Sequence, residues 1–438
     1  MPPPGAGNLS LGAALVLPSF PGSEPPDWIR RFLADGGRGI VLFSYNVDDL
    51  PALAASLRAE RDDVLLALDE EGGDVTRLEW REGSSYPSAA ALGALDEPAL
   101  TEEVAAAIAA DLAAAGVNWN FAPVADVNVP ANPVIGVRSF GSDVSLVARH
   151  VAAAVRGFQR VGVAACAKHF PGHGSTVEDS HLALPALVGP IEAGLEPFRA
   201  AIAADVASIM TAHIKVNADA ATLDHTVLHD LLRRELGFEG AIVADALEMK
   251  GVSGRHGLFD AAVLAVEAGA DALIVGHDVS PEDTVRIVAA LDERVSPERL
   301  EEAGARVASL AAFARPRAAE VDRGAALAAA ERAVHVDGDI SFSGEPSIVE
   351  LRPVANIAAG EAEHGLAPTV VREGEPIPEA DVYVVRDVHR HPWMEAVDRP
   401  GAVVVEIGLP VWRPTAARGY VSSLGGGRAS LEAVEALL

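Results

Sequence analysis

Short apolar runs alternate with longer segments of helical pattern from the N-terminus to about residue 315. The apolar runs are nearly continuous in hydrophobicity, which is typical of strands buried on both faces of a parallel sheet. They predict strands at 13–18, 40–45, 64–69, 117–122, 163–169, 208–214, 241–245 and 272–276. Helices are predicted at 27–34, 50–61, 101–115, 146–159, 191–204, 227–236, 258–268 and 282–291.

Eight strands that alternate with eight helices over roughly 250–330 residues are typical of a (β/α)8, TIM-like barrel in the α/β class. A doubly wound open sheet is the alternative, but no GxGxxG turn joins a strand to a helix here. After about residue 315 the sequence predicts a helix, a turn-rich segment, three strands and a last helix, at 318–334, 336–346, 347–352, 381–386, 402–407 and 430–438. We therefore predict a barrel domain over 1–335 and a small α/β C-terminal domain over 345–438.

The composition narrows the classes of partner. A net charge of −29, from 63 acidic and 34 basic residues, repels phosphate backbones, so we expect no nucleic-acid partner. Cys166 is the single cysteine, which rules out an intrachain disulfide and suits the cytoplasm. The apolar run 11–17 is short for a signal peptide, and no segment reaches the roughly 18 apolar residues that span a bilayer. We expect no membrane partner, and nothing in the pattern indicates an oligomeric state.

Polar side chains gather where the predicted strands end. The fifth strand leads into a loop that breaks at Pro171-Gly172 and presents Lys168, His169, His173, Asp179 and His181 close together in the sequence. Asp69, His213 and Asp245 end three other predicted strands. Any one of these residues could simply cap a neighbouring helix. Several strand ends of this kind predict the catalytic face of a barrel.

Two of these groups suit acid–base and nucleophilic chemistry. Asp179 and His181 are two residues apart on a loop, where a carboxylate fixes the tautomer of an imidazole and favours its charged form. They predict a general acid–base pair, although incidental polar residues on a surface loop are the alternative. Asp245 lies in an apolar strand and could act as a nucleophile, or be buried in a salt bridge with Lys168 or Lys250. Glu248 is a rival carboxylate past the strand end.

The remaining polar motifs give weaker signals. Asp69 could accept hydrogen bonds from ligand hydroxyls, whereas its neighbours Glu70, Glu71 and Asp74 are more typical of solvated loop charges. Arg138 could bind a ligand or hold its own loop. The imidazoles and carboxylate of the 169–181 loop could ligate zinc, but their spacing fits neither HExxH nor a paired cysteine site, so no metal is predicted. His389 and His391 are interpreted as surface residues, and the glycines at 425–427 could hold an anion.

Six blocks of the sequence carry a family resemblance. They read LDEEGGDVTRL, NFAPVADVN, NPVIGVRSFGSD, KHFPGHGSTVEDSHLALP, MTAHI and IVADALEM, and together they extend over roughly residues 10–315. In these blocks the chain resembles glycoside hydrolase family 3, in its β-N-acetylhexosaminidase branch. The resemblance implies a barrel enzyme without a cofactor that removes terminal β-linked N-acetylglucosamine (GlcNAc) from small carbohydrates with retention. It implies Asp245 as nucleophile, His181 oriented by Asp179 as acid–base, and Asp69, Arg77, Arg138, Lys168 and His169 as sugar-holding residues.

The chain also departs from the family pattern. Ala244 and Ala246 flank Asp245 where the family often has SDD, and Glu70 and Asp74 stand where DQEGGRV has Gln and Arg. A phosphorylase of the same family is an alternative, because a neutral histidine does not repel an incoming phosphate as a glutamate would. A non-catalytic sugar-binding protein is a second alternative, and a metal-dependent hydrolase a distant third. The family's usual substrates are cell-wall recycling fragments in the bacterial cytoplasm.

Overall fold

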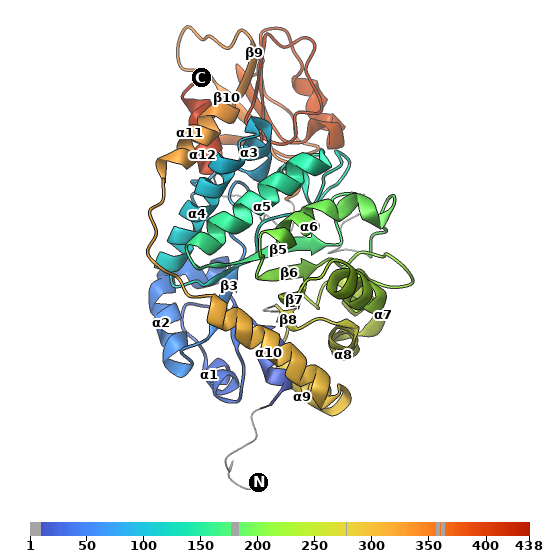
Figure 1. Cartoon of the computed structure of the whole chain (residues 1–438). Coiled ribbons are helices and arrows are strands. Elements are labelled where there is room, and N and C mark those ends of the chain that lie inside the picture. The colour runs from blue at the N-terminus through green and yellow to red at the C-terminus, as the bar shows by residue number, and fades with distance from the viewer. Residues whose placement is uncertain (1–9, 177–183, 277, 356–359, 361–363) are drawn as a thin grey trace.

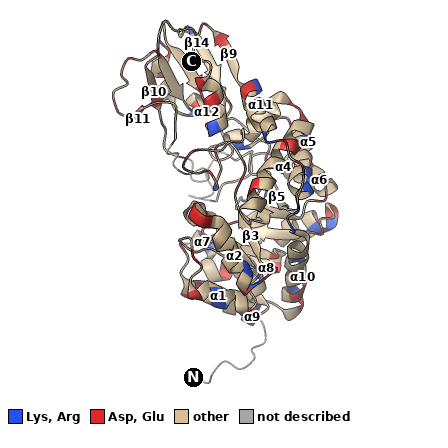
Figure 2. Ribbon diagram, turned by 90° about the vertical axis from the view of Figure 1, so that its left-hand side faces the viewer, with Lys and Arg blue, Asp and Glu red and all other residues tan. Residues whose placement is uncertain are grey.

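Two sheets, one eight-stranded and one six-stranded, form the two parts of the protein (Figure 1). This computed structural model describes residues 10–176, 184–276, 278–355, 360 and 364–438. Acidic and basic residues both occur along the ribbon of the two parts (Figure 2). None of the helices in the described ranges combines the length and apolarity needed to cross a membrane.

The eight-stranded sheet is a parallel barrel. Its strands are β1 (Val16–Pro18), β2 (Gly39–Val41), β3 (Leu65–Leu68), β4 (Trp119–Asn120), β5 (Ala164–Phe170), β6 (Ser208–Thr211), β7 (Ala241–Ala244) and β8 (Ala272–Val275). They pair in the order β1-β8-β7-β6-β5-β4-β3-β2, and β1 also contacts β2. Every predicted strand overlaps an observed one, and the predicted barrel is confirmed.

Helices surround the barrel in the expected alternation. They are α1 (Asp27–Ala34), α2 (Leu50–Glu60), α3 (Ala89–Leu95), α4 (Pro98–Ala114), α5 (Val144–Arg160), α6 (Glu196–Ala203), the π-helix η6 (Thr226–Glu235), α7 (Lys250–His256), α8 (Leu258–Ala268), α9 (Pro281–Arg294) and α10 (Pro297–Phe313). Helix α5 shows how the sequence sets an end: the Asp143 carboxylate accepts the Leu146 N–H at 2.7 Å, which satisfies a free donor of the first turn.

Helix α10 was missing from the sequence prediction. It begins after Ser296, whose hydroxyl caps the Arg299 N–H, and has proline at its first position. Its residues Val307 and Leu310 pack into the same apolar cluster as the inward-facing Leu17 and Trp119 of the barrel strands. The helix therefore contributes to the barrel core.

The second sheet has the order β11-β10-β12-β13-β14-β9. Its strands are β9 (His335–Gly338), β10 (Ile348–Leu351), β11 (Thr369–Val371), β12 (Val382–Val385), β13 (Val403–Glu406) and β14 (Gly419–Ser422), with helix α12 (Arg428–Glu435) after β14. All neighbours are parallel except β9, which runs antiparallel to β14. β9, β11 and β14 were not predicted, and β9 lies in the segment that was interpreted as turn-rich.

The two parts are joined by a segment that runs along the outside of the barrel after α10 (Figure 1). It leads to α11 (Gly324–Ala333), which starts later than the predicted helix 318–334. Helix α11 contacts α3 and α4 of the barrel and α12 of the second sheet. The barrel and the second part thus share packed helices as well as a covalent connection.

Candidate active site

A network of charges occupies the carboxyl ends of β3 and β5. The Lys168 side chain is almost fully buried, and its Nζ lies 2.6 Å from Asp69 Oδ1 and 2.6 Å from Glu71 Oε1. The Arg138 guanidinium donates to both oxygens of Glu71, at 2.9 and 2.8 Å. Arg77 Nη2 lies 3.6 Å from Asp69 Oδ2. The structure therefore brings four of the predicted sugar-holding residues together.

Glu71 is the centre of this network. Its burial alone would raise its pKa, but the positive charges of Arg138 and Lys168 lower the pKa well below the usual range. Lys168 is affected in the opposite sense: burial lowers its pKa, and Asp69 and Glu71 more than compensate and raise it. Both partners are therefore charged at neutral pH, and Asp69 keeps a partly exposed carboxylate beside them.

His169 is oriented by an acid from another strand. Its Nδ1 lies 2.7 Å from Asp126 Oδ2, and Asp126 is fully buried in the loop after β4. The His173 backbone N–H donates to the other oxygen of Asp126 at 2.5 Å. Burial opposes the charge of Asp126, but the attraction of His169 and the other partners lowers its pKa. The carboxylate therefore fixes the direction of the His169 ring.

Asn132 joins the loops that follow β4 and β5. Its side-chain amide donates to the carbonyls of His173, Gly174 and Thr176 at 2.9, 3.2 and 3.0 Å. Its oxygen accepts the backbone N–H groups of Val134 and Ile135, both at 2.8 Å. This fully buried residue therefore clamps the backbone up to Thr176. The predicted acid–base residues Asp179 and His181 follow in the sequence and lie outside the described residues.

Asp245 directly follows β7 and is half-buried at the same end of the barrel as Lys168. Its Oδ1 accepts the backbone N–H of Ala246 at 2.8 Å. The fully buried His213, after β6, donates from Nε2 to the Ala246 carbonyl at 3.0 Å. The backbone beside the Asp245 carboxylate is therefore fixed from two sides. The rival carboxylate Glu248 is also half-buried, and burial raises its pKa.

Comparisons with known proteins add the evolutionary context. The family model described as "Glycosyl hydrolase family 3 N terminal domain" matches residues 31–310. The chain belongs to glycosyl hydrolase family 3. It is 36% identical over 330 residues to a β-hexosaminidase from Methylococcus capsulatus, in a match that covers 72% of this chain and 95% of the relative.

Solved structures of family 3 enzymes resemble the fold at two levels. A β-N-acetylglucosaminidase from a Paenibacillus species matches with a TM-score of 0.84 and 30% identity, over 98% of this chain and 96% of that chain. A β-N-acetylhexosaminidase from Beutenbergia cavernae matches with a TM-score of 0.64 and 29% identity, over 70% of this chain and 98% of that chain. Family 3 members thus match either the whole molecule or a part of it.

Two expectations from the sequence need correction, and the first concerns the acidic residues after β3. Glu70, Glu71 and Asp74 are not solvated loop charges, because their side chains are buried. The Glu70 carboxylate accepts the Arg77 and Leu78 N–H groups at 2.9 and 3.0 Å, and burial raises its pKa to about 7. Arg138 does tie two loops together, through Glu71.

The second correction concerns the histidines of the second sheet, whereas the glycine run has a ligand within the chain itself. His389 and His391 are half-buried, and His389 Nε2 lies 2.8 Å from the Pro130 carbonyl of the barrel. The glycines at 425–427 do hold an anion, which is a carboxylate of the protein itself, since the Gly426 N–H donates to Asp74.

The zinc alternative named His169, His173, Asp179 and His181 as ligands. The ring centroids of His169 and His173 lie 6.0 Å apart, and His169 contacts Asp126. Asp179 and His181 lie outside the described residues. Within the described part of the chain, the group with metal-ligating atoms close enough to share an ion is His225, His229 and Asp230, at the helix after β6. That helix lies on the outside of the barrel, so the group belongs to another part of the surface.

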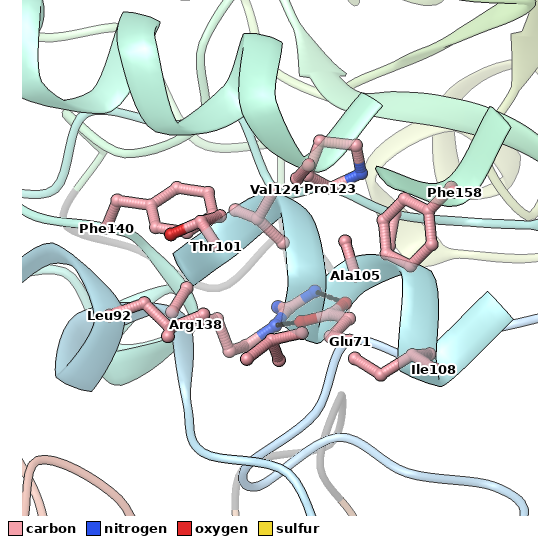
Figure 3. A pocket seen from close by; sticks show the side chains of 14 residues that line it. Glu71, Leu92, Thr101, Ala105, Ile108, Pro123, Val124, Arg138, Phe140 and Phe158 are labelled. Carbon is pink, nitrogen blue, oxygen red and sulfur yellow. Dashed lines mark hydrogen bonds and ion pairs between the residues drawn. The ribbon is translucent and has the colours of Figure 1, made fainter. Parts of the chain in front are cut away.

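A small cavity lies behind the charge network. Glu71 and Arg138 form part of its wall, opposite apolar side chains such as Phe140 and Phe158 (Figure 3). Its volume of about 30 Å³ holds one or two water molecules and is far too small for a sugar ring. The cavity therefore keeps the inner side of the Glu71–Arg138 pair in apolar surroundings and is not the sugar site.

Proposed function

We propose that this family 3 glycosyl hydrolase is a β-N-acetylhexosaminidase that removes terminal β-linked GlcNAc with retention of configuration. The observation that carries the proposal is the charge network of Lys168, Asp69, Glu71 and Arg138 at the end of the barrel where Asp245 lies. A sugar presents several hydroxyls, which need both donors and acceptors in fixed positions. The name of the Methylococcus relative supports a hexosamine as the sugar, and the name of the Paenibacillus relative supports GlcNAc.

Each residue then has a role. Asp69 accepts hydrogen bonds from sugar hydroxyls, and Lys168, His169, Arg77 and Arg138 hold the sugar or the groups that contact it. Asp245 attacks the anomeric carbon and forms a glycosyl–enzyme ester. His181, oriented by Asp179, gives a proton to the leaving oxygen in this step and takes one from water in the next. The reaction needs no cofactor. Cell-wall fragments in the cytoplasm are the proposed natural substrates.

The first test compares aryl β-GlcNAc with aryl β-glucoside, each with and without phosphate. We expect release of free GlcNAc at a rate that phosphate does not change. Formation of a sugar 1-phosphate would instead establish the phosphorylase alternative, and preference for the glucoside would overturn the assigned sugar. An absence of turnover with intact sugar binding would indicate the non-catalytic alternative.

The second test concerns the two chemical groups. Asp245→Ala should abolish turnover, and a slow fluorinated GlcNAc substrate should leave a covalent sugar on the peptide that contains Asp245, detected by mass spectrometry. Asp179→Ala should slow the reaction less for substrates with an activated leaving group, because these need little protonation. Equal slowing of activated and unactivated substrates would contradict His181 as the acid.

A further inference from the structure

The loop after β3 carries much of the charge network. Its base is fixed by Asn120, whose side chain accepts the Glu70 N–H at 3.0 Å and donates to the Glu70 carbonyl at 2.8 Å. The Glu70 carboxylate accepts a hydrogen bond from the Arg77 backbone N–H, and the Glu71 N–H donates to the Val75 carbonyl at 3.0 Å. Glu71, the tip of the loop and Arg77 therefore move as one folded unit.

The tip of this loop is held by the second sheet. The Asp74 carboxylate forms an ion pair with Arg386, at the end of β12, and its Oδ1 accepts the Gly426 N–H at 2.7 Å. The Asp74 side chain is only 9% exposed and that of Arg386 is 27% exposed, so the carboxylate is largely shielded from water. A buried carboxylate that lost its cation would carry an uncompensated charge. Asp74 therefore depends on Arg386.

Two glycines leave little space on the second sheet's side of this contact. A Cβ atom at Gly426 would lie 2.2 Å from Arg386 Nη2, and one at Gly427 would lie 2.8 Å from the Gly73 carbonyl oxygen. Gly73 itself has a φ of +58°, which glycine adopts without strain. The two backbones thus approach each other closely at the Asp74 carboxylate.

Further contacts extend the same interface along the loop. Arg428 forms an ion pair with Glu79, and the Ala429 N–H donates to the Ser84 carbonyl at 3.1 Å. Ser88, which caps α3, donates its hydroxyl to the Leu424 carbonyl. The segment between β14 and α12 therefore follows the β3 loop from its tip to the start of α3.

We propose that Arg386 and Gly426 are positioning residues for the sugar site, acting through Asp74 on the β3 loop. By holding the loop tip they fix Glu71 and Arg77, which in turn hold Lys168 and Asp69. The inference rests on the proposed function. It also accounts for an acid at position 74, where the family pattern has arginine: the second sheet of this chain supplies the arginine.

The test measures hydrolysis of aryl β-GlcNAc and competitive inhibition by GlcNAc for wild type, Arg386→Met, Arg386→Lys and Gly426→Ala. We expect KM and the GlcNAc inhibition constant to rise about 10–100-fold in Arg386→Met, because displacement of Arg77 and Asp69 weakens hydrogen bonds between the sugar and charged groups, and such bonds contribute about this factor to binding. Arg386→Lys should recover part of the loss. Gly426→Ala displaces the guanidinium without removing it, so it should raise KM and the GlcNAc inhibition constant by a smaller factor.

The matched control is Arg332→Gln, which breaks the exposed ion pair between Arg332 of α11 and Glu97 beside α4. It should leave KM unchanged. A purely structural loss in the Arg386 variants would reduce the amount of active enzyme and lower kcat at constant KM, and this result would overturn the proposal. If Arg386→Met does not fold, judged by circular dichroism, Gly426→Ala and Arg386→Lys decide. Absence of wild-type turnover would refute the proposed function, whereas turnover with unchanged KM in every variant would refute only the positioning role.

Discussion

At the carboxyl ends of the parallel strands, the two sheets hold buried glutamates in opposite charge states. In the barrel, Glu71 lies between Lys168 and Arg138, whose charges outweigh its burial and lower its pKa. In the second sheet, Glu406 at the end of β13 is fully buried and accepts only backbone N–H groups among its described hydrogen bonds, from Asp387, Val388 and Gly408. Burial and the nearby Asp387 raise its pKa to about 8.

The difference distinguishes strand ends that are suited to bind a ligand, in the barrel, from strand ends that contact another part of the protein, in the second sheet. Ionised groups held at fixed positions suit hydroxyl recognition, since the charges are ready before the ligand arrives. Glu406 instead ties together the turns that begin at Asp387 and Gly408, and the first of these turns contacts the barrel through His389. The second sheet therefore uses its buried acid to shape a surface that holds the barrel loops.

The two glutamates also make stability depend on pH with opposite signs. The lowered pKa of Glu71 adds stability above the unfolded value of about 4.5, and this stability is lost as the pH falls through the folded value. The raised pKa of Glu406 means that its contribution is fully present below about 4.5 and is lost as the pH rises to about 8. Substitutions of the two glutamates should therefore be distinguishable by how the free energy of unfolding changes with pH.

Lys168→Met should give the largest effect. Removing one partner of a buried pair costs roughly 3–5 kcal/mol, and the substitution leaves Asp69 and Glu71 with one cation fewer. We expect a large rise in KM for aryl β-GlcNAc and a fall in the free energy of unfolding, measured by urea denaturation at neutral pH. The exposed-pair variant Arg332→Gln is the control and should change neither quantity. An unchanged KM would show that the network is structural only.

Glu406→Gln should act mainly on the pH profile. An amide cannot ionise, so the loss of stability between about pH 5 and pH 8 should shrink by roughly 2–4 kcal/mol. The KM for aryl β-GlcNAc should stay the same, because Glu406 contacts backbone groups of its own sheet. Denaturation at pH 5 and pH 8 measures the first quantity. A wild-type-like pH profile in the variant would contradict a protonated Glu406 at neutral pH.

Glu70→Gln should have the smallest effect of the three substitutions. Like Glu406→Gln, it should reduce the loss of stability at high pH. Glutamine keeps an oxygen to accept the Arg77 and Leu78 N–H groups, and the family pattern has glutamine at this position. Because burial raises the Glu70 pKa to about 7, the variant should gain roughly 1–3 kcal/mol at pH 8 relative to pH 4.5. Paired denaturation curves at the two pH values measure this gain. A loss of stability at pH 8 would mean that ionised Glu70 is needed by its loop.

The barrel could be predicted because its strands are short, continuous apolar runs, whereas elements with other signals were missed. β9 has four exposed residues and therefore no hydrophobic pattern to reveal it. Helix α10 did carry a signal, in Ser296-Pro297 and in apolar residues at helical spacing from Leu300 to Leu310. The pattern of eight strand–helix units is complete before this helix begins, so the repeat itself does not predict it.

The candidate site divides along similar lines. Residues at strand ends, such as Asp69, Lys168 and Asp245, follow from the position of each apolar run. Asp126 and Glu71 do not, since their partners are 43 and 67 residues away in the sequence. Only the closure of the barrel brings those segments together. The position of an acid on a loop gives no indication of whether a distant arginine or histidine will neutralise it.

The Asn132 clamp has a consequence for the ageing of the protein. Asparagine deamidates when the next backbone nitrogen attacks the side-chain amide to close a cyclic imide. Residue 133 is proline, whose nitrogen carries no hydrogen and cannot make that attack. An amide that binds three carbonyls would become a repelling carboxylate if it were hydrolysed. The dipeptide thus protects a side chain whose hydrolysis would separate the two loops that it joins.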